Sequence, residues 1–222
     1  LVLAQVDIEP SPSIETGMLD LMREKFGDSF PTTRAFSKFA RETLSDAVSV
    51  EDPDIAVVAW ITHEERLFRT FERYIVGKRL DDGFTGDNRV DDFVSYSLHV
   101  HNRRKSRAGS ALENHMEYLL TERRIRFERG VRTEGRAKPD FLFPGSREYH
   151  DRTFPVELLT MLGSKTTAKD RWRQILAEAD RISTKHLLTL QPGISGHQLQ
   201  EMEAHHVIPV IPQGIRETYP SC

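Results

Sequence analysis

The chain has little cysteine: its one cysteine, Cys222, stands at the last position. Disulfide bonds therefore do not hold this fold together, and a reducing cytoplasm is the compartment that the composition favours. No apolar run approaches the roughly 18 residues that are needed to span a bilayer. No signal peptide opens the sequence either. These absences argue against a membrane protein and against a disulfide-stabilised secreted domain.

Several catalytic signatures are also missing. The sequence contains no glycine-rich phosphate loop and no Gly-x-Ser-x-Gly elbow, which argues against nucleotide hydrolysis and serine-type catalysis. The nine histidines show no metal-ligand spacing, and there is no internal repeat.

The composition is that of an ordinary globular protein, with 222 residues, 38% hydrophobic and 29% charged. The net charge of −3 is unevenly spread. Residues 1–100 contain 11 Lys+Arg against 19 Asp+Glu (11 − 19 = −8), and residues 101–222 contain 20 against 15 (20 − 15 = +5). A basic half favours a nucleic-acid partner. Taken alone, however, the asymmetry is explained as simply by a solvated surface.

Hydrophobic spacing predicts that the first hundred residues are helical. The expected helices cover residues 14–27, 32–44, 53–80 and 90–102, with Thr32 or Thr33 as a cap and Phe36, Phe39 and Ala40 directed inward. A separate amphipathic helix is expected to start at Gly109 or Ser110.

The pattern changes after residue 124. Short apolar stretches at 125–131, 140–143, 162–166, 186–190 and 206–211 predict strands, and 168–181 and 195–205 predict helices between them. The expected fold class is therefore α/β or α+β, a small mixed sheet flanked by helices. We predict one domain over residues 1–222, with a helical subregion at 1–100 and a mixed α/β core at 101–222.

A candidate site begins with Asp140 at the mouth of a short strand, and Lys165 follows 25 residues later. Metal-assisted phosphodiester cleavage needs oxygen ligands for a hard cation and a cationic group near the phosphate. The common nuclease pattern has a second acid two residues before the lysine, where this chain has Gly163. Glu178 is the preferred substitute, because Asp170, Gln174 and Glu178 would share one helical face.

Other interpretations of these residues are open. Glu157 and Glu113 are rival donors of the second carboxylate, and an aspartate before a strand is more often a cap than a metal ligand. Lys169, Asp170 and Arg171 suit guanine and cytosine edges, although charge in a first helical turn is usually only solvated. The run Arg103, Arg104, Lys105 and Arg107 suits phosphate contacts, although a run of charges is usually only solvated surface.

Longer blocks of sequence resemble a known family. They are Asn102–Gly109 with Leu112-Glu113, Lys138–Pro144, Tyr149–Asp151, Phe154–Glu157, Leu162–Thr167, Lys169–Leu176 and Leu188–Gly193. Together they are similar to the catalytic domain of the EcoRII-type restriction endonucleases, relatives of the SsoII/PspGI group. The resemblance covers roughly residues 90–215 well and the helical first part loosely.

The resemblance implies a PD-(D/E)xK nuclease core whose second acid has moved to Glu178. It implies that Asp140, Lys165 and Glu178 form the catalytic triad, with Tyr149 and Glu113 beside it and Asp140 and Glu178 holding Mg²⁺. Lys169, Asp170 and Arg171 would read the outer C·G pairs of a CCWGG-type site, and the central bases would be flipped out of the stack.

The function expected from this resemblance is that of a type II site-specific deoxyribonuclease acting as a homodimer on double-stranded DNA in a prokaryotic cytoplasm. A separate upstream effector domain, as in EcoRII, is expected to be absent from this chain. The alternative is a non-catalytic DNA-binding module that retains the nuclease fold. Such a module would bind DNA in a salt-dependent way without Mg²⁺-dependent cleavage.

Overall fold

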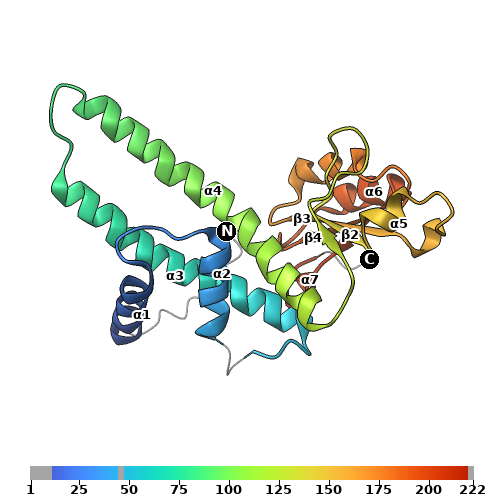
Figure 1. Ribbon diagram of the computed structural model, residues 1–222, viewed down its shortest axis with the longest axis horizontal. Coiled ribbons are helices and arrows are strands. Elements are labelled where there is room, and N and C mark those ends of the chain that lie inside the picture. Colours follow the sequence, from blue (N-terminus) through green and yellow to red (C-terminus); the bar gives the residue numbers. More distant parts are fainter. Residues whose placement is uncertain (1–11, 45–47, 220–222) are drawn as a thin grey trace. The chain divides into compact units, whose positions relative to one another are not determined.

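The computed structural model describes residues 12–44 and 48–219, with side chains from residue 17 onward, and the chain divides into two compact units (Figure 1). Within the described ranges, residues 12–44 and 59–111 form the first unit, and residues 48–58 and 112–219 form the second. Two long helices, α3 (Pro53–Asp82) and α4 (Arg89–Glu122), contribute to both. Cys222 lies outside the described residues.

The first unit is helical, as predicted. Helix α1 (Pro12–Phe26) is followed by Gly27, whose positive φ of 67° suits the residue after a helix end. Helix α2 (Thr33–Glu42) is capped by the Thr32 hydroxyl, which accepts from the backbone N–H of Ala35 at 3.3 Å. The core of the unit consists of Met22, Phe36, Phe39, Ala40, Leu67, Phe68 and Phe71. The predicted inward placement of Phe36, Phe39 and Ala40 is confirmed.

The prediction of two helices at 90–102 and from Gly109 or Ser110 is wrong, because α4 runs unbroken from Arg89 to Glu122. Gly109 lies inside it without a positive φ, and a Cβ atom there would meet nothing within 4 Å. A glycine in that position lowers helix propensity but does not end the helix.

The second unit contains a five-stranded mixed sheet of order β1-β2-β3-β4-β5. The strands are β1 (Glu128–Arg129), β2 (Phe141–Phe143), β3 (Thr160–Lys165), β4 (Lys185–Thr189) and β5 (Val207–Val210). The first two pairings are antiparallel and the last two parallel. The predicted mixed sheet, with strands in these five places, is confirmed.

Parallel neighbours require crossover connections, and two helical segments provide them. A 3₁₀ helix, η4 (Lys169–Ala177), connects β3 to β4, and α6 (Gly196–Ala204), capped by Ser195, connects β4 to β5. The main core of this unit includes Leu142, Met161, Trp172, Ile175 and Leu187. Three short elements escaped prediction because three to five residues show no periodicity: α5 (Ser146–His150), η3 (Val156–Leu158) and α7 (Gln213–Arg216).

The predicted α-helix over 168–181 is wrong in type and in extent. The segment forms a 3₁₀ helix that ends at Ala177, and Glu178 is extended, with φ −100° and ψ 140°. Trp172 and Ile175, both fully buried, are three residues apart, and a helix of three residues per turn places them on the same side. Asp170, Gln174 and Glu178 therefore do not share a helical face.

None of the helices among the described residues is both long enough and apolar enough to cross a membrane.

Candidate active site

Asp140 and Lys165 meet at one edge of the sheet. Asp140 directly precedes β2 and Lys165 ends β3, and the antiparallel register that pairs Phe141 with Leu162 brings these two strand ends together. The Lys165 ammonium donates to Asp140 Oδ2 at 2.6 Å, and the backbone N–H of Ser164 donates to the same oxygen at 2.6 Å. Both side chains are largely buried, with 12% and 17% of their surface exposed. The carboxylate and the amine are thus held in a fixed geometry.

Glu178 lies within electrostatic reach of this pair. Its pKa is raised to about 7, mainly because burial penalises the charged form and further because the Asp140 carboxylate repels it. Lys165 and Lys185 oppose this rise in the pKa. One Glu178 carboxylate oxygen, Oε2, is buried and has no hydrogen-bond partner among the described residues. Two carboxylates and one ammonium therefore converge at the site.

The backbone around Glu178 is held by Lys185 at the start of β4. Lys185 is a buried residue, and its ammonium donates to the carbonyl oxygens of Glu178 at 2.5 Å and Ala179 at 2.6 Å. The backbone N–H of Ala179 donates to the Thr133 hydroxyl at 3.3 Å, and Ala179 has a φ of 52°. Lys185 is a site residue that the sequence patterns do not indicate; its only local signal is a lysine at the start of an apolar strand.

Packing explains why position 163 has no acid. A Cβ atom on Gly163 would lie 2.7 Å from Cγ2 of Ile175, closer than Cβ atoms approach other heavy atoms. Ile175 comes from η4 and is fully buried against the sheet. The space that a carboxylate at 163 would need is therefore occupied, and the second acid reaches the site from the far end of η4.

Tyr149 supports the chain segment that follows Glu178. Its hydroxyl donates to Glu134 and accepts from the backbone N–H of Arg181 at 3.1 Å. The second Glu134 oxygen accepts from the backbone N–H of Asp180 at 3.1 Å. Burial and the Glu134 carboxylate raise the pKa of the Tyr149 hydroxyl well above its usual range, so the phenol stays protonated. Glu134, which the sequence did not reveal, completes this network.

Glu113 is engaged with an arginine of β1. Arg129 donates to Glu113 at 2.7 Å, to Glu117 at 2.5 Å and to the side-chain carbonyl of Asn114 at 2.9 Å. The structure thus places Glu113 in a ladder that joins α4 to the sheet edge. The other rival for the second carboxylate, Glu157, lies in η3 and is exposed.

The predicted base-reading residues Lys169, Asp170 and Arg171 open η4, and all three are exposed. Asp170 accepts from Arg173 at 3.2 Å in an exposed pair. The backbone N–H of Lys169 donates to the Gln191 side chain at 3.0 Å, which anchors the turn.

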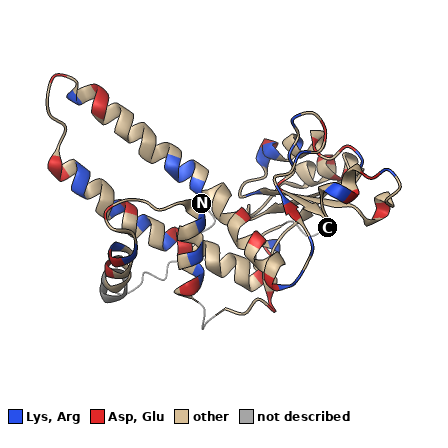
Figure 2. Ribbon diagram, in the orientation of Figure 1, with Lys and Arg blue, Asp and Glu red and all other residues tan. Residues whose placement is uncertain are grey.

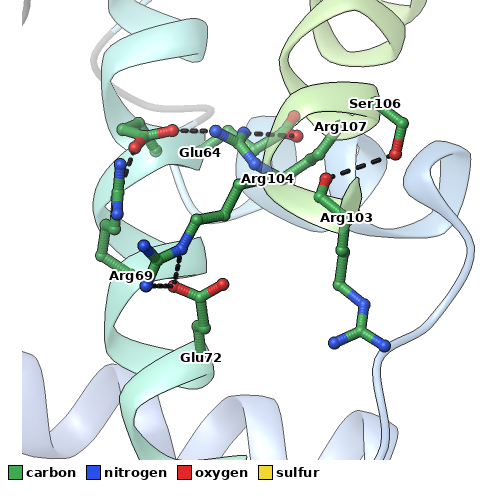
Figure 3. A network of polar contacts seen from close by, with 8 residues as sticks. Glu64, Arg69, Glu72, Arg103, Arg104, Ser106 and Arg107 are labelled. Carbon is green, nitrogen blue, oxygen red and sulfur yellow. Dashed lines mark hydrogen bonds and ion pairs between the residues drawn. The ribbon is translucent and has the colours of Figure 1, made fainter. Parts of the chain in front are cut away.

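The basic run 103–107 is largely occupied within the first unit (Figure 3). Arg104 donates to Glu72 at 2.8 Å, and the Arg103 guanidinium lies 4.3 Å from the centre of the Phe30 ring. Arg107 is buried, paired with Glu64 at 3.5 Å and also with Glu65. The prediction that Arg107 contacts a DNA phosphate is corrected accordingly: its charge is neutralised inside the protein.

The donor set fits a hard divalent cation. Asp140 and Glu178 both offer carboxylate oxygens, the ligands that Mg²⁺ prefers, and the unpartnered buried Glu178 oxygen beside a second carboxylate is an arrangement that a cation would neutralise. Across the described ranges, no cluster of three or more His, Cys, Asp or Glu side chains has metal-binding geometry. Two carboxylates leave the remaining positions to water and substrate, as is usual for Mg²⁺.

Comparison with known proteins assigns the family. The family described as "EcoRII C terminal" matches residues 68–222, which include the whole site. The chain belongs to the EcoRII C-terminal family. It is also 46% identical over 170 residues to the type II restriction enzyme EcoRII of Escherichia coli. That alignment covers 76% of this chain and 41% of EcoRII, so the chain spans about two fifths of its relative's length.

Solved structures show the same fold. Metal-depleted Ecl18kI in complex with uncleaved, modified DNA is 19% identical and superposes with a TM-score of 0.68 over 91% of this chain and 76% of the other. The complex of the restriction endonuclease PspGI with substrate DNA is 16% identical, with a TM-score of 0.68 over 85% of this chain and 79% of the other. The EcoRII C-terminal family member described here thus has the PD-(D/E)xK restriction-endonuclease fold, as predicted.

Proposed function

We propose that this chain is the catalytic part of a type II restriction endonuclease that hydrolyses double-stranded DNA with Mg²⁺. The observation that carries the proposal is the convergence of Asp140, Lys165 and Glu178 from two strand ends and the segment after η4. Membership of the EcoRII C-terminal family supports it. In this proposal, residues 1–222 act as one catalytic domain, with a helical subregion at 1–100 and the nuclease core at 101–222, in a prokaryotic cytoplasm.

Each residue of the site has a distinct role in the proposed reaction. Asp140 and Glu178 hold the cation, which when bound supplies Lewis-acid stabilisation and acidifies water. The Lys165 ammonium orients Asp140 and offers a positive charge to the attacked phosphate. Lys185 and the Tyr149–Glu134 pair keep the Glu178 segment in place. Glu113, held by Arg129, completes the group of catalytic residues.

The proposed target is a short pseudo-palindromic site flanked by CC and GG, of the CCWGG type, with the central bases flipped out. The exposed residues Lys169, Asp170 and Arg171 read the outer C·G pairs, since cationic groups match guanine O6 and N7 and a carboxylate accepts from cytosine N4. Arg103, Arg104 and Lys105 contact phosphates in this proposal. A target with two-fold symmetry is matched by a homodimer with the same symmetry.

The test is cleavage of a duplex containing CCWGG with Mg²⁺ by the wild-type chain, Lys165→Ala and Glu178→Gln. Wild type is expected to cut the site, and both variants are expected to lose at least about 10²-fold in rate, as is typical when a group that stabilises the transition state is removed. Both variants should still bind the duplex, because the exposed cations of η4 are untouched. Equal cleavage by wild type and Lys165→Ala would refute the assignment.

One other outcome identifies the alternative function. A chain that binds the duplex with strong salt dependence, yet cuts no site with Mg²⁺, is a DNA-binding module on a nuclease fold. In that case Asp140→Ala and Glu178→Ala would leave both the binding affinity and its salt dependence unchanged.

A further inference from the structure

The loop between β1 and β2 exposes charge of one sign. Residues 130–139 form this loop, here termed the β1–β2 loop, which leads directly into Asp140. Its exposed residues are two glycines and three cations, Arg132, Arg136 and Lys138; the loop can be followed in Figure 2, where Lys and Arg are blue. Among the described residues, none of these three side chains has a hydrogen bond or an ion pair. The three cations are therefore free to bind a partner.

The surface of the β1–β2 loop suits phosphate groups. It exposes no large apolar side chain, whereas protein interfaces bury aromatic and aliphatic anchors at their centre. The arginines before the loop are neutralised inside the unit: Arg126 pairs with Glu148, and Arg129 donates to Glu113 at 2.7 Å. The only acid of the loop, Glu134, is half-buried and turned inward. The loop surface therefore matches the phosphates of a nucleic acid better than the surface of another protein.

The inner side of the β1–β2 loop holds the chain just after Glu178. The buried Thr133 hydroxyl accepts from the backbone N–H of Ala179 at 3.3 Å. The Glu134 carboxylate accepts from the backbone N–H of Asp180 at 3.1 Å. Two successive N–H groups thus anchor to this loop the backbone that carries one of the two proposed metal ligands.

The β1–β2 loop is also tied to Asp140, the other proposed ligand. The backbone N–H of Gly130 donates to the carbonyl of Asp140 at 3.1 Å and closes the loop at its base. Within the loop, the backbone N–H of Ala137 donates to the carbonyl of Glu134 at 2.7 Å, and that of Thr133 donates to the carbonyl of Ala137 at 3.1 Å. The outward cations and the inward side chains therefore share one hydrogen-bonded turn. A displacement of this turn moves the supports of both ligands.

The cations of the loop lie close to the site along the chain. Lys138 precedes Asp140 by two residues, so at most about 7 Å of extended chain separates their Cα atoms. Successive nucleotides of one DNA strand advance only about 3.4 Å along the axis. A duplex with its attacked phosphate beside Lys165 therefore has neighbouring phosphates within reach of so close a cation.

We infer that the β1–β2 loop is a clamp on the DNA backbone that couples duplex binding to the binding of the metal ion. Arg132, Arg136 and Lys138 bind phosphates next to the attacked one, and the loop that they fix in place holds the Asp140 and Glu178 backbones in position for the cation. Such coupling is reciprocal, so the metal ion tightens duplex binding by the same factor as the duplex tightens metal binding. The inference rests on the proposed function in taking double-stranded DNA as the partner and a hard divalent cation as the ion.

The first test is the salt dependence of duplex binding, measured by fluorescence anisotropy with a chelator present. Each lost phosphate contact lowers the slope of log affinity against log salt by about 0.9, so the triple variant Arg132→Gln/Arg136→Gln/Lys138→Gln should lower it by about 2–3. The loss of affinity should be the same on a CCWGG duplex and on an unrelated duplex, because phosphates carry no sequence information. Arg216→Gln is the matched control, since it removes an exposed arginine that follows β5, at the opposite edge of the sheet. The control should keep the wild-type slope, and an unchanged slope in the triple variant would overturn the inference.

The second test measures the coupling on uncleaved DNA. Duplex affinity is compared between chelator and Ca²⁺, a hard cation that takes oxygen ligands, and the duplex is checked to be intact after each titration. Wild type is expected to bind more tightly with Ca²⁺ by a factor of about 5–150, the range typical of coupled sites. In the triple variant this factor should be smaller by at least about threefold, whereas Arg216→Gln should keep it. An equal factor in wild type and the triple variant, or no tightening in wild type, would overturn the coupling.

Thr133→Val tests the link between the loop and Glu178. It removes the hydroxyl that accepts from Ala179 but removes no cation, so the salt slope should equal that of wild type while the Ca²⁺ factor falls. Thr133→Ser keeps a hydroxyl at this position and should restore the factor. A Thr133→Val variant with the full factor would show that the loop does not act through Glu178 and would overturn the inference.

These measurements separate the clamp from the cleavage reaction. A chain that shows the loop-dependent slope and the coupling, yet cuts no duplex with Mg²⁺, would refute the proposed function and leave the clamp standing. A chain that cuts CCWGG while the triple variant keeps the wild-type slope and Ca²⁺ factor would refute the clamp and leave the proposed function standing.

Discussion

Glu178 is a carboxylate that is placed where its ionised form is unfavourable. It is half-buried beside a second carboxylate, and its pKa is raised from an ordinary 4.5 to about 7. Its backbone has no freedom to withdraw, because Lys185, Thr133, Tyr149 and Glu134 hold the residues that follow. Such a residue lowers stability where it is ionised, in return for placing a charge at the site.

We therefore expect Glu178→Gln to raise the stability of the metal-free protein at alkaline pH. Since the folded state holds its proton up to about pH 7 and the unfolded state only to about pH 4.5, wild type loses stability as the pH rises through this window. At pH 8 the variant should be more stable by about 1–2 kcal/mol, a figure reduced for partial solvent exposure.

Urea unfolding at pH 4 and pH 8 in the presence of a chelator measures this difference. The extra stability of Glu178→Gln should vanish at pH 4. As a control, the exposed substitution Glu203→Gln should have the same free energy of unfolding as wild type at both pH values. A variant less stable than wild type at pH 8 would show that the Glu178 carboxylate is not electrostatically strained.

A second prediction concerns Gly163. Because a Cβ atom there would meet Ile175 at 2.7 Å, Gly163→Ala should lower the free energy of unfolding by about 1–3 kcal/mol. Gly109→Ala is the control, because a Cβ atom there would meet nothing within 4 Å. This substitution should raise the free energy of unfolding by about 0.5–1 kcal/mol.

The same contact predicts that an acid at position 163 cannot replace Glu178. The double variant Gly163→Glu/Glu178→Gln should remain inactive in the cleavage assay, because the new side chain displaces η4 before it reaches Asp140. Recovered cleavage would mean that Ile175 yields easily and that packing does not dictate where the second acid stands.

Among the elements, helix α4 makes side-chain contacts with both α3 and β1. Its middle carries Arg107, whose guanidinium is buried, pairs with Glu64 and Glu65, and lies 4.4 Å from the centre of the Phe68 ring. Its last turns carry Glu113, Asn114 and Glu117, which bind Arg129 of β1. In the first unit these contacts join α4 to α3, and in the second they join it to the sheet.

Arg107→Ala is expected to destabilise the protein by about 3–5 kcal/mol, because it removes the buried guanidinium that pairs with the fully buried Glu64. Arg104→Ala, which removes a half-exposed arginine, should cost about 1 kcal/mol. Thermal or urea unfolding gives both values. If Arg107→Ala unfolds like wild type while its DNA affinity falls, the residue serves phosphate binding after all.

For the whole molecule, the two units are interleaved in sequence. Residues 48–58 belong to the second unit although more than fifty residues of the first follow them. The Asp54 carboxylate accepts from the backbone N–H of Gln213 at 3.0 Å, and Arg123 donates to the carbonyl of Val50 at 3.0 Å. Ala56 and Val57 are buried. The second unit is therefore discontinuous along the chain.

A fragment of residues 112–222 should consequently be much less stable than the same fragment linked through a Gly/Ser segment to residues 48–58. Losing the buried Val57 and Ala56 side chains and two hydrogen bonds costs on the order of several kcal/mol. Denaturant unfolding followed by circular dichroism compares the two. Equal midpoints would show that residues 48–58 are not part of the cooperative unit.

Local patterns in the sequence were sufficient for much of the fold. Alternating apolar stretches predicted five strands in the right places, and Thr32 marked a helix start by its capping chemistry. They misled at Gly109, where packing tolerates a residue of low helix propensity, and over 168–181. In that second segment the chain forms a 3₁₀ helix that buries Trp172 and Ile175, where composition favours an α-helix.

By itself, the sequence determined the strands, the caps and the approach of Asp140 to Lys165, because each depends on neighbours or on strand ends a short connection apart. Only the tertiary structure decided which carboxylate joins them and which arginines are exposed. The helical face shared by Asp170, Gln174 and Glu178, which favours Glu178 in the sequence, does not exist in the structure. Ile175 fills the space that an acid at position 163 would need, and Lys185 holds the backbone of Glu178 beyond the end of η4. Contacts between residues distant in sequence leave no local pattern, so the side chain that fills a given space becomes visible only in the folded chain.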